Sequence, residues 1–190
     1  MKPIYKYLST KITNSRIKAT NETIKQIVKD EVDRLGPDAD LNYIDVSEVS
    51  NMRDLFSQLL DPYAISKINP KYIGLNPDIS EWDVSNVKNM DSMFRFCSKF
   101  NCDISKWNVS QVKNMYQMFY ECESFNQDIS NWDVRNVESV RDMFYSCKSF
   151  DQDLSKWNMP KAGPIYDFDM FYNCPIKDKK ELLPNIRFRK

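Results

Sequence analysis

The chain has 190 residues, a length typical of one domain, and 42% of them are hydrophobic, which is enough for a packed core. Lys and Arg total 27, as do Asp and Glu, so the zero net charge favours neither nucleic-acid binding nor action on acidic substrates. Only 3 residues are Gly, so Asn, Asp, Ser and Pro must form the turns. The charge is uneven: residues 1–27 and 177–190 are basic, and the middle of the chain is acidic.

The first 43 residues are predicted to form an arm and a capping helix. Thr20 and Asn21 followed by Glu22 are typical of a helix start, and Gly36-Pro37 of a helix end. Between them, apolar residues follow a helical spacing at Ile24, Ile27, Val28 and Val32. We therefore expect an amphipathic helix over 21–35 that covers the first repeat. Residues 1–18 are either a flexible arm or part of the same cap.

The beginning of the chain shows no secretion signal, because residues 1–25 are basic and lack an apolar run of signal-sequence length. No stretch approaches the roughly 18 apolar residues of a membrane helix. The sequence thus predicts a cytoplasmic protein without a membrane span.

A period of 25 residues runs through the middle of the chain. Two successive units read FNCDISKWNVSQVKNMYQMFYEC from Phe100 and FNQDISNWDVRNVESVRDMFYSC from Phe125. Full repeats occupy about 76–174, and a partial repeat occupies 44–56, separated by about 13 extra residues near 61–73. We expect a repeat domain over 44–174, then a C-terminal cap or tail over 175–190. Three apolar residues of that tail could cover the last repeat: Leu182, Leu183 and Ile186.

Two periodicities follow one another inside a unit. Ile104, Trp107, Val109 and Val112 have offsets 0, 3, 5 and 8, as in leucine-rich repeats. Trp-x-Val has the alternation of a short strand, and the spacing after Val112 becomes helical. We therefore expect one short strand and one short helix per repeat, in an α/β solenoid of the leucine-rich-repeat type with an N-terminal helical cap.

The string FNxDISxWDVSxVxNMxxMFxxC resembles the BspA-like leucine-rich repeats of bacterial surface proteins. Residues 76–174 match it closely and 44–56 match it in part. The resemblance implies protein binding or surface adhesion, provides no catalytic residues to carry over, and leaves a cell-surface location open if the chain is trimmed.

The cysteines and tryptophans recur in register. Cys97, Cys122 and Cys147 are interpreted as a buried thiol ladder, although disulfides between neighbours stay open. Cys102 is either an exposed reactive thiol or a neutral replacement of Gln. The chain has no His and no C-x-x-C pair, so we expect no metal and no cofactor. The tryptophans are interpreted as core residues rather than a ligand-stacking platform: Trp82, Trp107, Trp132 and Trp157.

A column of aspartates, each two residues before a serine, is interpreted as turn caps rather than as a calcium stack. Its members are Asp78, Asp103, Asp128 and Asp153.

Residues that alternate with the inward Trp and Val are expected to point outward. Their charge varies between repeats while the apolar positions stay constant, as in a scaffold with a tunable face. We call nine of them the predicted binding face: Glu81, Asp83, Lys106, Asn108, Asn131, Asp133, Arg135, Lys156 and Asn158.

The function predicted from the sequence is non-enzymatic binding of a protein partner. The chain lacks a His for acid–base chemistry near neutral pH, and it lacks the G-x-S-x-G, P-loop and dinucleotide motifs. Three alternatives stay open: surface adhesion, nucleic-acid binding through the basic termini, and structural self-assembly. The partner and the oligomeric state are open as well.

Overall fold

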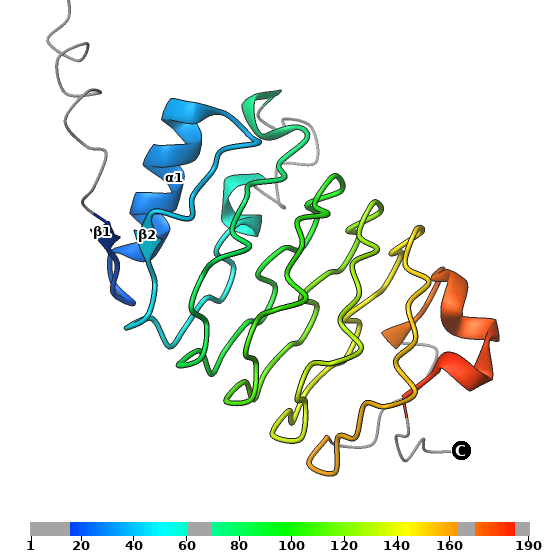
Figure 1. Cartoon of the computed structure of the whole chain (residues 1–190). Helices are drawn as coiled ribbons and strands as arrows, with labels where there is room; N and C mark the ends of the chain where they lie inside the picture. Colours follow the sequence, from blue (N-terminus) through cyan, green and yellow to red (C-terminus); the bar gives the residue numbers. More distant parts are fainter. Residues whose placement is uncertain (1–15, 61–69, 163–169, 185–190) are drawn as a thin grey trace, which may run out of the picture.

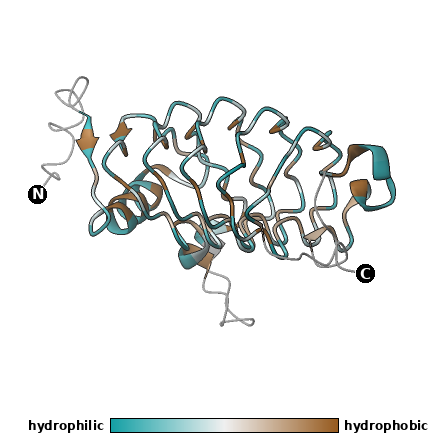
Figure 2. Cartoon of the chain, turned by 90° about the horizontal axis from the view of Figure 1, so that it is seen from below, coloured by the Kyte–Doolittle hydropathy of each residue, from teal (hydrophilic) through white to brown (hydrophobic). Residues whose placement is uncertain are grey.

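The computed structural model describes residues 16–60, 70–162 and 170–184. Successive parts of the chain form a row of loops lying side by side, with the helix and the sheet at one end (Figure 1). The first elements are β1 (Ile17–Lys18), α1 (Ile24–Leu35) and β2 (Ile44–Asp45). Short 3₁₀ helices follow at Ser57–Leu60, Pro70–Tyr72, Pro175–Asp178 and Lys180–Leu182. Along each loop, hydrophobic and hydrophilic positions alternate (Figure 2).

The N-terminal end of the row consists of β1, β2 and α1. β1 pairs in parallel with β2, and Ile17 lies opposite Ile44. α1 begins at Ile24 rather than at residue 21, because residues 20–23 form a tighter turn in which the Thr23 N–H donates to the Thr20 carbonyl at 3.2 Å. The buried face of α1 joins the core through Ile24, Val28 and Val32.

The core is a continuous apolar cluster along the row of loops. The four tryptophans are 1–4% exposed, so the prediction that they are core residues is confirmed. Each indole N–H donates to a carbonyl of the preceding loop; the Trp132 Nε1 lies 3.2 Å from the Ile104 oxygen. Because a buried N–H needs an acceptor, this bond fixes each tryptophan against its neighbouring loop.

Phenylalanine rings stack along the row in two columns. Phe94, Phe119, Phe144 and Phe171 follow one another at centroid distances of 5.6, 5.7 and 5.6 Å. The second column, which begins at Phe100, continues at 5.9 and 5.7 Å. Each such pair contributes about 0.5–1.5 kcal/mol beyond its buried area.

The predicted strand at Trp-x-Val and the predicted helix after Val112 are both wrong. The backbone ladder between full loops lies instead where the helix was expected: the Met90, Ser92, Phe94 and Phe96 N–H groups donate to carbonyls of the next loop at 2.8–3.0 Å. Isolated parallel bridges occur in this segment and connect Asn51, Asn89, Asn114 and Ser139 in succession.

The ladder segment is irregular because residues other than glycine adopt left-handed conformations in it. They recur four positions apart in a loop, as at Ser92 and Phe96, with φ values of 51° to 67° over the whole set: Asp54, Ser92, Phe96, Gln117, Glu121, Asp142, Ser146 and Asn173. A left-handed residue interrupts a regular strand and a regular helix alike. Hydrophobic spacing does not reveal the sign of φ, so the predicted strand and helix of each repeat were wrong.

The fold class must therefore be corrected. Among the described residues, α1 is the only complete α-helix and β1–β2 the only sheet, and within the full repeats 76–174 only Met170 is α-helical. This finding overturns the leucine-rich-repeat-like α/β solenoid with one strand and one helix per repeat. Most of the predicted arm, residues 61–69 of the insertion, and Ile186 lie outside the described residues. At the C-terminal end, the Leu182 carbonyl accepts the Leu154 N–H at 2.8 Å, and Leu183 packs against the core.

Candidate functional site

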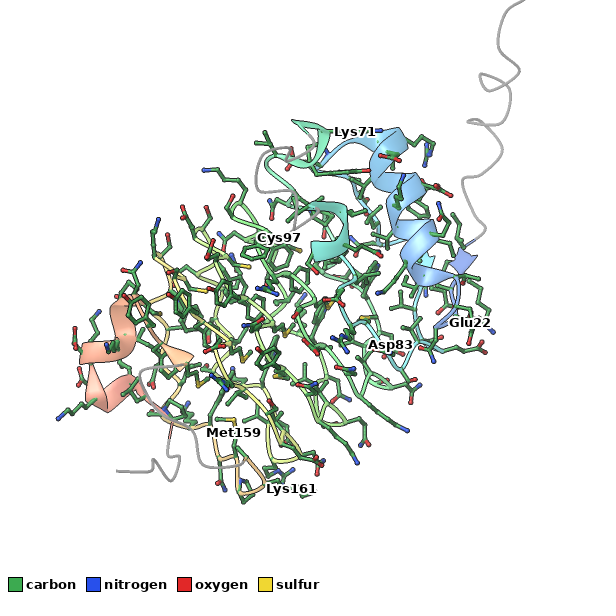
Figure 3. The ribbon with its side chains drawn as sticks, turned by 180° about the vertical axis from the view of Figure 1, so that it is seen from behind. Glu22, Lys71, Asp83, Cys97, Met159 and Lys161 are labelled. Atoms are coloured by element: carbon green, nitrogen blue, oxygen red, sulfur yellow. The ribbon has the colours of Figure 1, made fainter. Side chains whose placement is uncertain are left out.

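The predicted binding face lies on the surface of the row. Eight of its nine residues are exposed, and Asp133 is half-buried. Figure 3 places Asp83 toward the edge that carries Lys161, away from Cys97.

Part of this face stabilises backbone turns. The side-chain oxygens of Asp83, Asn108 and Asp133 accept the backbone N–H two residues later at 3.1–3.2 Å. Arg135 also pairs with Asp133 at 2.7 Å, and its hydrogen bond lowers the pKa of that carboxyl. The other five side chains have no hydrogen bond or ion pair within the described part of the chain: Glu81, Lys106, Asn131, Lys156 and Asn158.

The aspartate column has the capping role predicted for it. Asp78, Asp103, Asp128 and Asp153 each accept the backbone N–H two residues later at 2.8–3.1 Å. Hydrogen bonds from the paired serine lower the pKa of each carboxyl. Over residues 16–60, 70–162 and 170–184, no cluster of three carboxylates or thiols could hold a metal ion.

The predicted thiol ladder is confirmed. Cys97, Cys122 and Cys147 are buried and free, and the Cys122 thiol donates to the Phe94 carbonyl at 2.9 Å. Cys102 is half-buried, and burial raises its pKa to about 11. It is therefore a thiol at neutral pH, not a reactive thiolate.

A surface row of aromatic and cationic side chains follows the phenylalanine column. Arg95, Tyr120, Tyr145 and Tyr172 each come directly after a phenylalanine of that column, so they stand in register. The rings of Tyr120 and Tyr145 stack at 4.5 Å, and those of Tyr145 and Tyr172 at 4.8 Å. The Arg95 guanidinium lies 5.1 Å from the Tyr120 centroid, and the Lys177 ammonium lies 5.8 Å from that of Tyr172. We call these five residues the tyrosine row.

The three hydroxyls of the tyrosine row have no hydrogen-bond acceptor among the described residues. Tyr172 is 48% exposed, and Tyr120 and Tyr145 are half-buried. The Arg95 Nε is buried and has no hydrogen-bond partner in the described part of the chain. The half-exposed hydroxyls can therefore donate to an acceptor on a partner, whereas the buried Arg95 Nε cannot.

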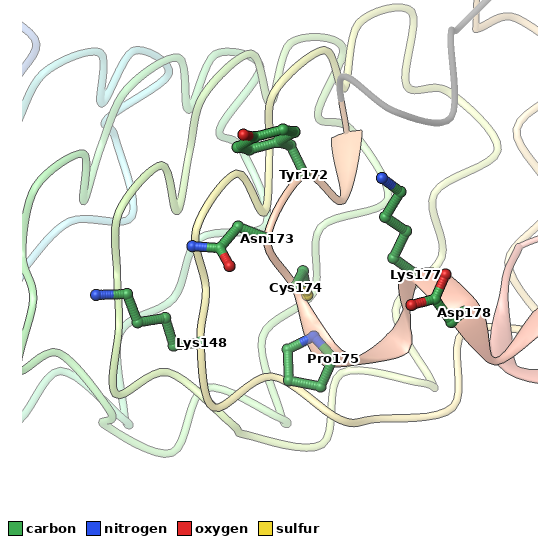
Figure 4. A pocket seen from close by; sticks show the side chains of 7 residues that line it. All are labelled: Lys148, Tyr172, Asn173, Cys174, Pro175, Lys177 and Asp178. Atoms are coloured by element: carbon green, nitrogen blue, oxygen red, sulfur yellow. The ribbon is translucent and has the colours of Figure 1, made fainter.

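An open pocket of about 650 Å³ adjoins the Tyr172 end of the row (Figure 4). Lys148 lines it and donates to Glu123 at 2.6 Å, and Asn173 donates to the Ser146 hydroxyl at 3.3 Å. The complete lining is Lys148, Tyr172, Asn173, Cys174, Pro175, Lys177 and Asp178.

Hydrophobic spacing did not indicate the tyrosine row. The Met-Phe pairs fitted a helical stripe, and the residue after each pair lay outside that pattern. The available signal was a Tyr in one register in three successive units, at Tyr120, Tyr145 and Tyr172.

Comparison with known proteins corrects the family resemblance. The family model described as "Mycoplasma protein of unknown function, DUF285" matches residues 63–182. No curated protein and no solved structure matches the chain. In the described residues, no helix is long and apolar enough to cross a membrane. The match to DUF285 replaces the BspA-like leucine-rich-repeat assignment, and most of the chain lies within that match. The chain belongs to the DUF285 family of Mycoplasma proteins of unknown function.

Proposed function

We propose that this chain is a non-enzymatic protein-binding module whose contact surface is the tyrosine row. The observation that carries the proposal is a half-exposed aromatic stack, Tyr120 to Tyr172, whose hydroxyls have no acceptor among the described residues. Tyr and Arg are enriched at the energetic centres of protein interfaces, because they combine a large apolar area with a polar group. The row offers both kinds of side chain on one rigid support.

The chemistry of the chain also supports binding rather than catalysis. The sequence has no His and none of the nucleophile or phosphate-binding motifs considered above. Its shifted aspartates stabilise turns, since hydrogen bonds from the paired serine lower the pKa of Asp103 and Asp128.

The predicted binding face is a second candidate surface. Five of its side chains are exposed and have no hydrogen bond or ion pair in the described ranges. One of its columns changes in charge from loop to loop: Glu81, Lys106, Asn131 and Lys156. These side chains support the original prediction, but the column lacks the aromatic residues that dominate interface energetics.

The experiment compares three full-length baits in a native lysate of the source organism. The first is the wild type, the second carries Tyr145→Ser and Tyr172→Ser, and the third carries Lys106→Ala, Asn131→Ala and Lys156→Ala. The third leaves Asp83, Asn108 and Asp133 in place because they cap turns. Before the capture experiment, urea titrations must show the same unfolding midpoint for all three baits.

A partner recovered by the wild type and the third bait, but not by the second, supports the tyrosine row. The recovered protein is then purified and its affinity for each bait measured by calorimetry. Equal affinity for the wild type and the tyrosine variant would refute the proposal that the tyrosine row is the contact surface. A loss confined to the third bait would move the site to the predicted binding face.

A further inference from the structure

We infer that the tyrosine row binds an extended acidic segment of the partner polypeptide, with carboxylates placed at the two ends of the row. The inference rests on the proposed protein-binding function and specifies the chemistry of the partner.

Arg95 is an arginine for which the described residues provide no carboxylate partner. Arg34, Arg53, Arg135 and Arg141 each lie within 4.0 Å of an acidic side chain. Arg95 has no ion pair within the described ranges, and it lies over the rings of its neighbours, 4.5 Å from the Phe96 centroid. Stacking on aromatic rings fixes the plane of the guanidinium, and because its Nε is buried, the two terminal nitrogens are the groups that can donate to a carboxylate.

The three tyrosine hydroxyls extend this set of donors. Elsewhere in the same chain, tyrosine hydroxyls donate to carboxylates: Tyr72 to Asp33 at 2.7 Å and Tyr43 to Glu31. The hydroxyls of the row have no such acceptor among the residues described. A partner that supplies carboxylate and carbonyl oxygens would satisfy them, because those groups accept and do not donate.

Lys177 provides a second positive charge at the far end. Its ammonium lies over Tyr172, and it forms no ion pair within the described part of the chain. Figure 4 shows Lys177 and Tyr172 together at the pocket, which leaves room for a side chain of the partner. Asp178 also lines the pocket, so the incoming carboxylate should approach the Lys177 side.

The carboxylates of the chain itself explain why the acids of the partner belong at the ends. Besides burial, Glu121 and Asp142 raise the pKa of Tyr120 through their negative charge. Asp142 accepts a hydrogen bond from Gln117 at 3.1 Å, whereas Glu121 has no side-chain partner among the described residues. Glu121 therefore repels an acid near Tyr120.

The geometry also limits the form of the segment. The steps along the row are 5.1, 4.5, 4.8 and 5.8 Å, a span that roughly six residues of extended chain would cover. Rings stacked at these distances leave no room for a proline or another ring to insert between them. The partner must therefore lie along the edges of the rings, where the partial charge is positive and favours acidic groups.

The test measures binding of a fluorescein-labelled 12-residue Ser peptide with two Glu about six positions apart to the purified chain, by fluorescence anisotropy. The same peptide with Gln at those two positions is the neutral control. We expect the Glu peptide to bind and the Gln peptide not to bind. Arg95→Gln should weaken binding about tenfold, the usual effect of losing a charge-assisted hydrogen bond. Arg95→Lys keeps the charge and loses the planar guanidinium, so its affinity for the Glu peptide should lie between those of the wild type and Arg95→Gln.

Two further variants make the test specific. Arg135→Gln removes one positive charge from the predicted binding face and should change the affinity less than about twofold, because exposed charges interact weakly over distance. Glu121→Gln should strengthen binding of the Glu peptide, because it removes the charge that repels the peptide. A variant that only destabilised the fold would weaken binding instead.

Equal binding of the two peptides, or an unchanged affinity in Arg95→Gln, would overturn the inference. So would tighter, Arg95-dependent binding of a 12-nucleotide single strand, since the row would then recognise phosphate. If the Glu peptide fails while an identified partner still requires Tyr145 and Tyr172, only the acidic-segment inference falls. If that partner does not require the tyrosines either, the proposed contact surface falls with it.

Discussion

Glu121 offers a direct test of the left-handed positions that set the course of each loop. Its φ is 57°, and its N–H donates to the Tyr145 carbonyl at 2.7 Å, so the conformation is held by the ladder. We compare Glu121→Gly with Glu121→Ala. Both variants remove the same charge and the same contacts, so they differ only in the presence of a Cβ.

The expected difference follows from two opposing effects. A residue with a Cβ in the left-handed region costs about 1–2 kcal/mol, which glycine avoids. Glycine loses about 0.5–1 kcal/mol through the greater conformational freedom of its unfolded state. Glu121→Gly should therefore be about 0.5–1 kcal/mol more stable than Glu121→Ala. In a chain of this length, each kcal/mol of stability raises the Tm by roughly 2–4 °C, so Glu121→Gly should have the higher Tm of the two variants.

Gln111 provides the matched control. It is exposed, lies in the same loop, and is not among the positions with a positive φ. There Ala should be more stable than Gly by about 0.5–1 kcal/mol, so the order of the two variants reverses. Urea unfolding followed by fluorescence of the buried tryptophans reports on all four variants. The same order at both positions would refute the conclusion that Glu121 is held in a strained conformation.

Three further predictions concern the core, the thiols and the turn caps. Trp132→Phe should reduce the free energy of unfolding by about 1–3 kcal/mol, since it removes the indole hydrogen bond to the Ile104 carbonyl, which keeps only its bond from the Trp107 N–H, and leaves unfilled volume in the core; urea titration measures this, and an unchanged midpoint would contradict it. No thiol of the native chain, Cys102 included, should react rapidly with a thiol reagent near pH 8, whereas all should react in urea; a fast native phase would contradict the raised thiol pKa values. The lowered pKa of Asp128 gives stability that is present above roughly pH 4 and lost as the pH falls through the folded-state pKa. Asp128→Asn keeps the acceptor oxygen and should flatten the fall in urea midpoint below that pH; an unchanged slope would contradict the link.

The burial of the tryptophans and cysteines and the capping by the aspartates could be predicted from the sequence, because these roles follow from the type of residue at each position. A Trp, a Cys or an Asp that recurs every 25 residues must occupy equivalent places, and burial of Trp107 or capping by Asp103 follows from what those side chains require. The course of the backbone could not be predicted. The apolar offsets of one repeat suit several coil geometries, and the left-handed turns at Gln117 and Glu121 depend on contacts with the next loop. The same offsets led to the wrong family.

The tyrosine row illustrates a different limit. A half-exposed Tyr145 carries no more signal than any other surface aromatic residue until the loops are stacked. Tyr145 becomes part of a contact surface only because it stacks on tyrosines 25 and 27 positions away, and the hydrophobic period within one unit does not predict that stacking.

The tryptophan bonds give the row of loops a direction. Trp107, Trp132 and Trp157 each donate to a carbonyl 28 positions earlier, so every loop depends on the loop before it for a buried acceptor. Trp82 makes the same kind of bond across 41 positions, to the Leu41 carbonyl, so the longer separation in sequence does not interrupt the order of these bonds. A duplicated 25-residue unit in the middle would have a tryptophan acceptor on one side and a tryptophan donor on the other. Removal of the first loop would leave the Trp82 indole N–H without its acceptor. The length of such a molecule can therefore change by whole units from within, while its beginning has to stay fixed.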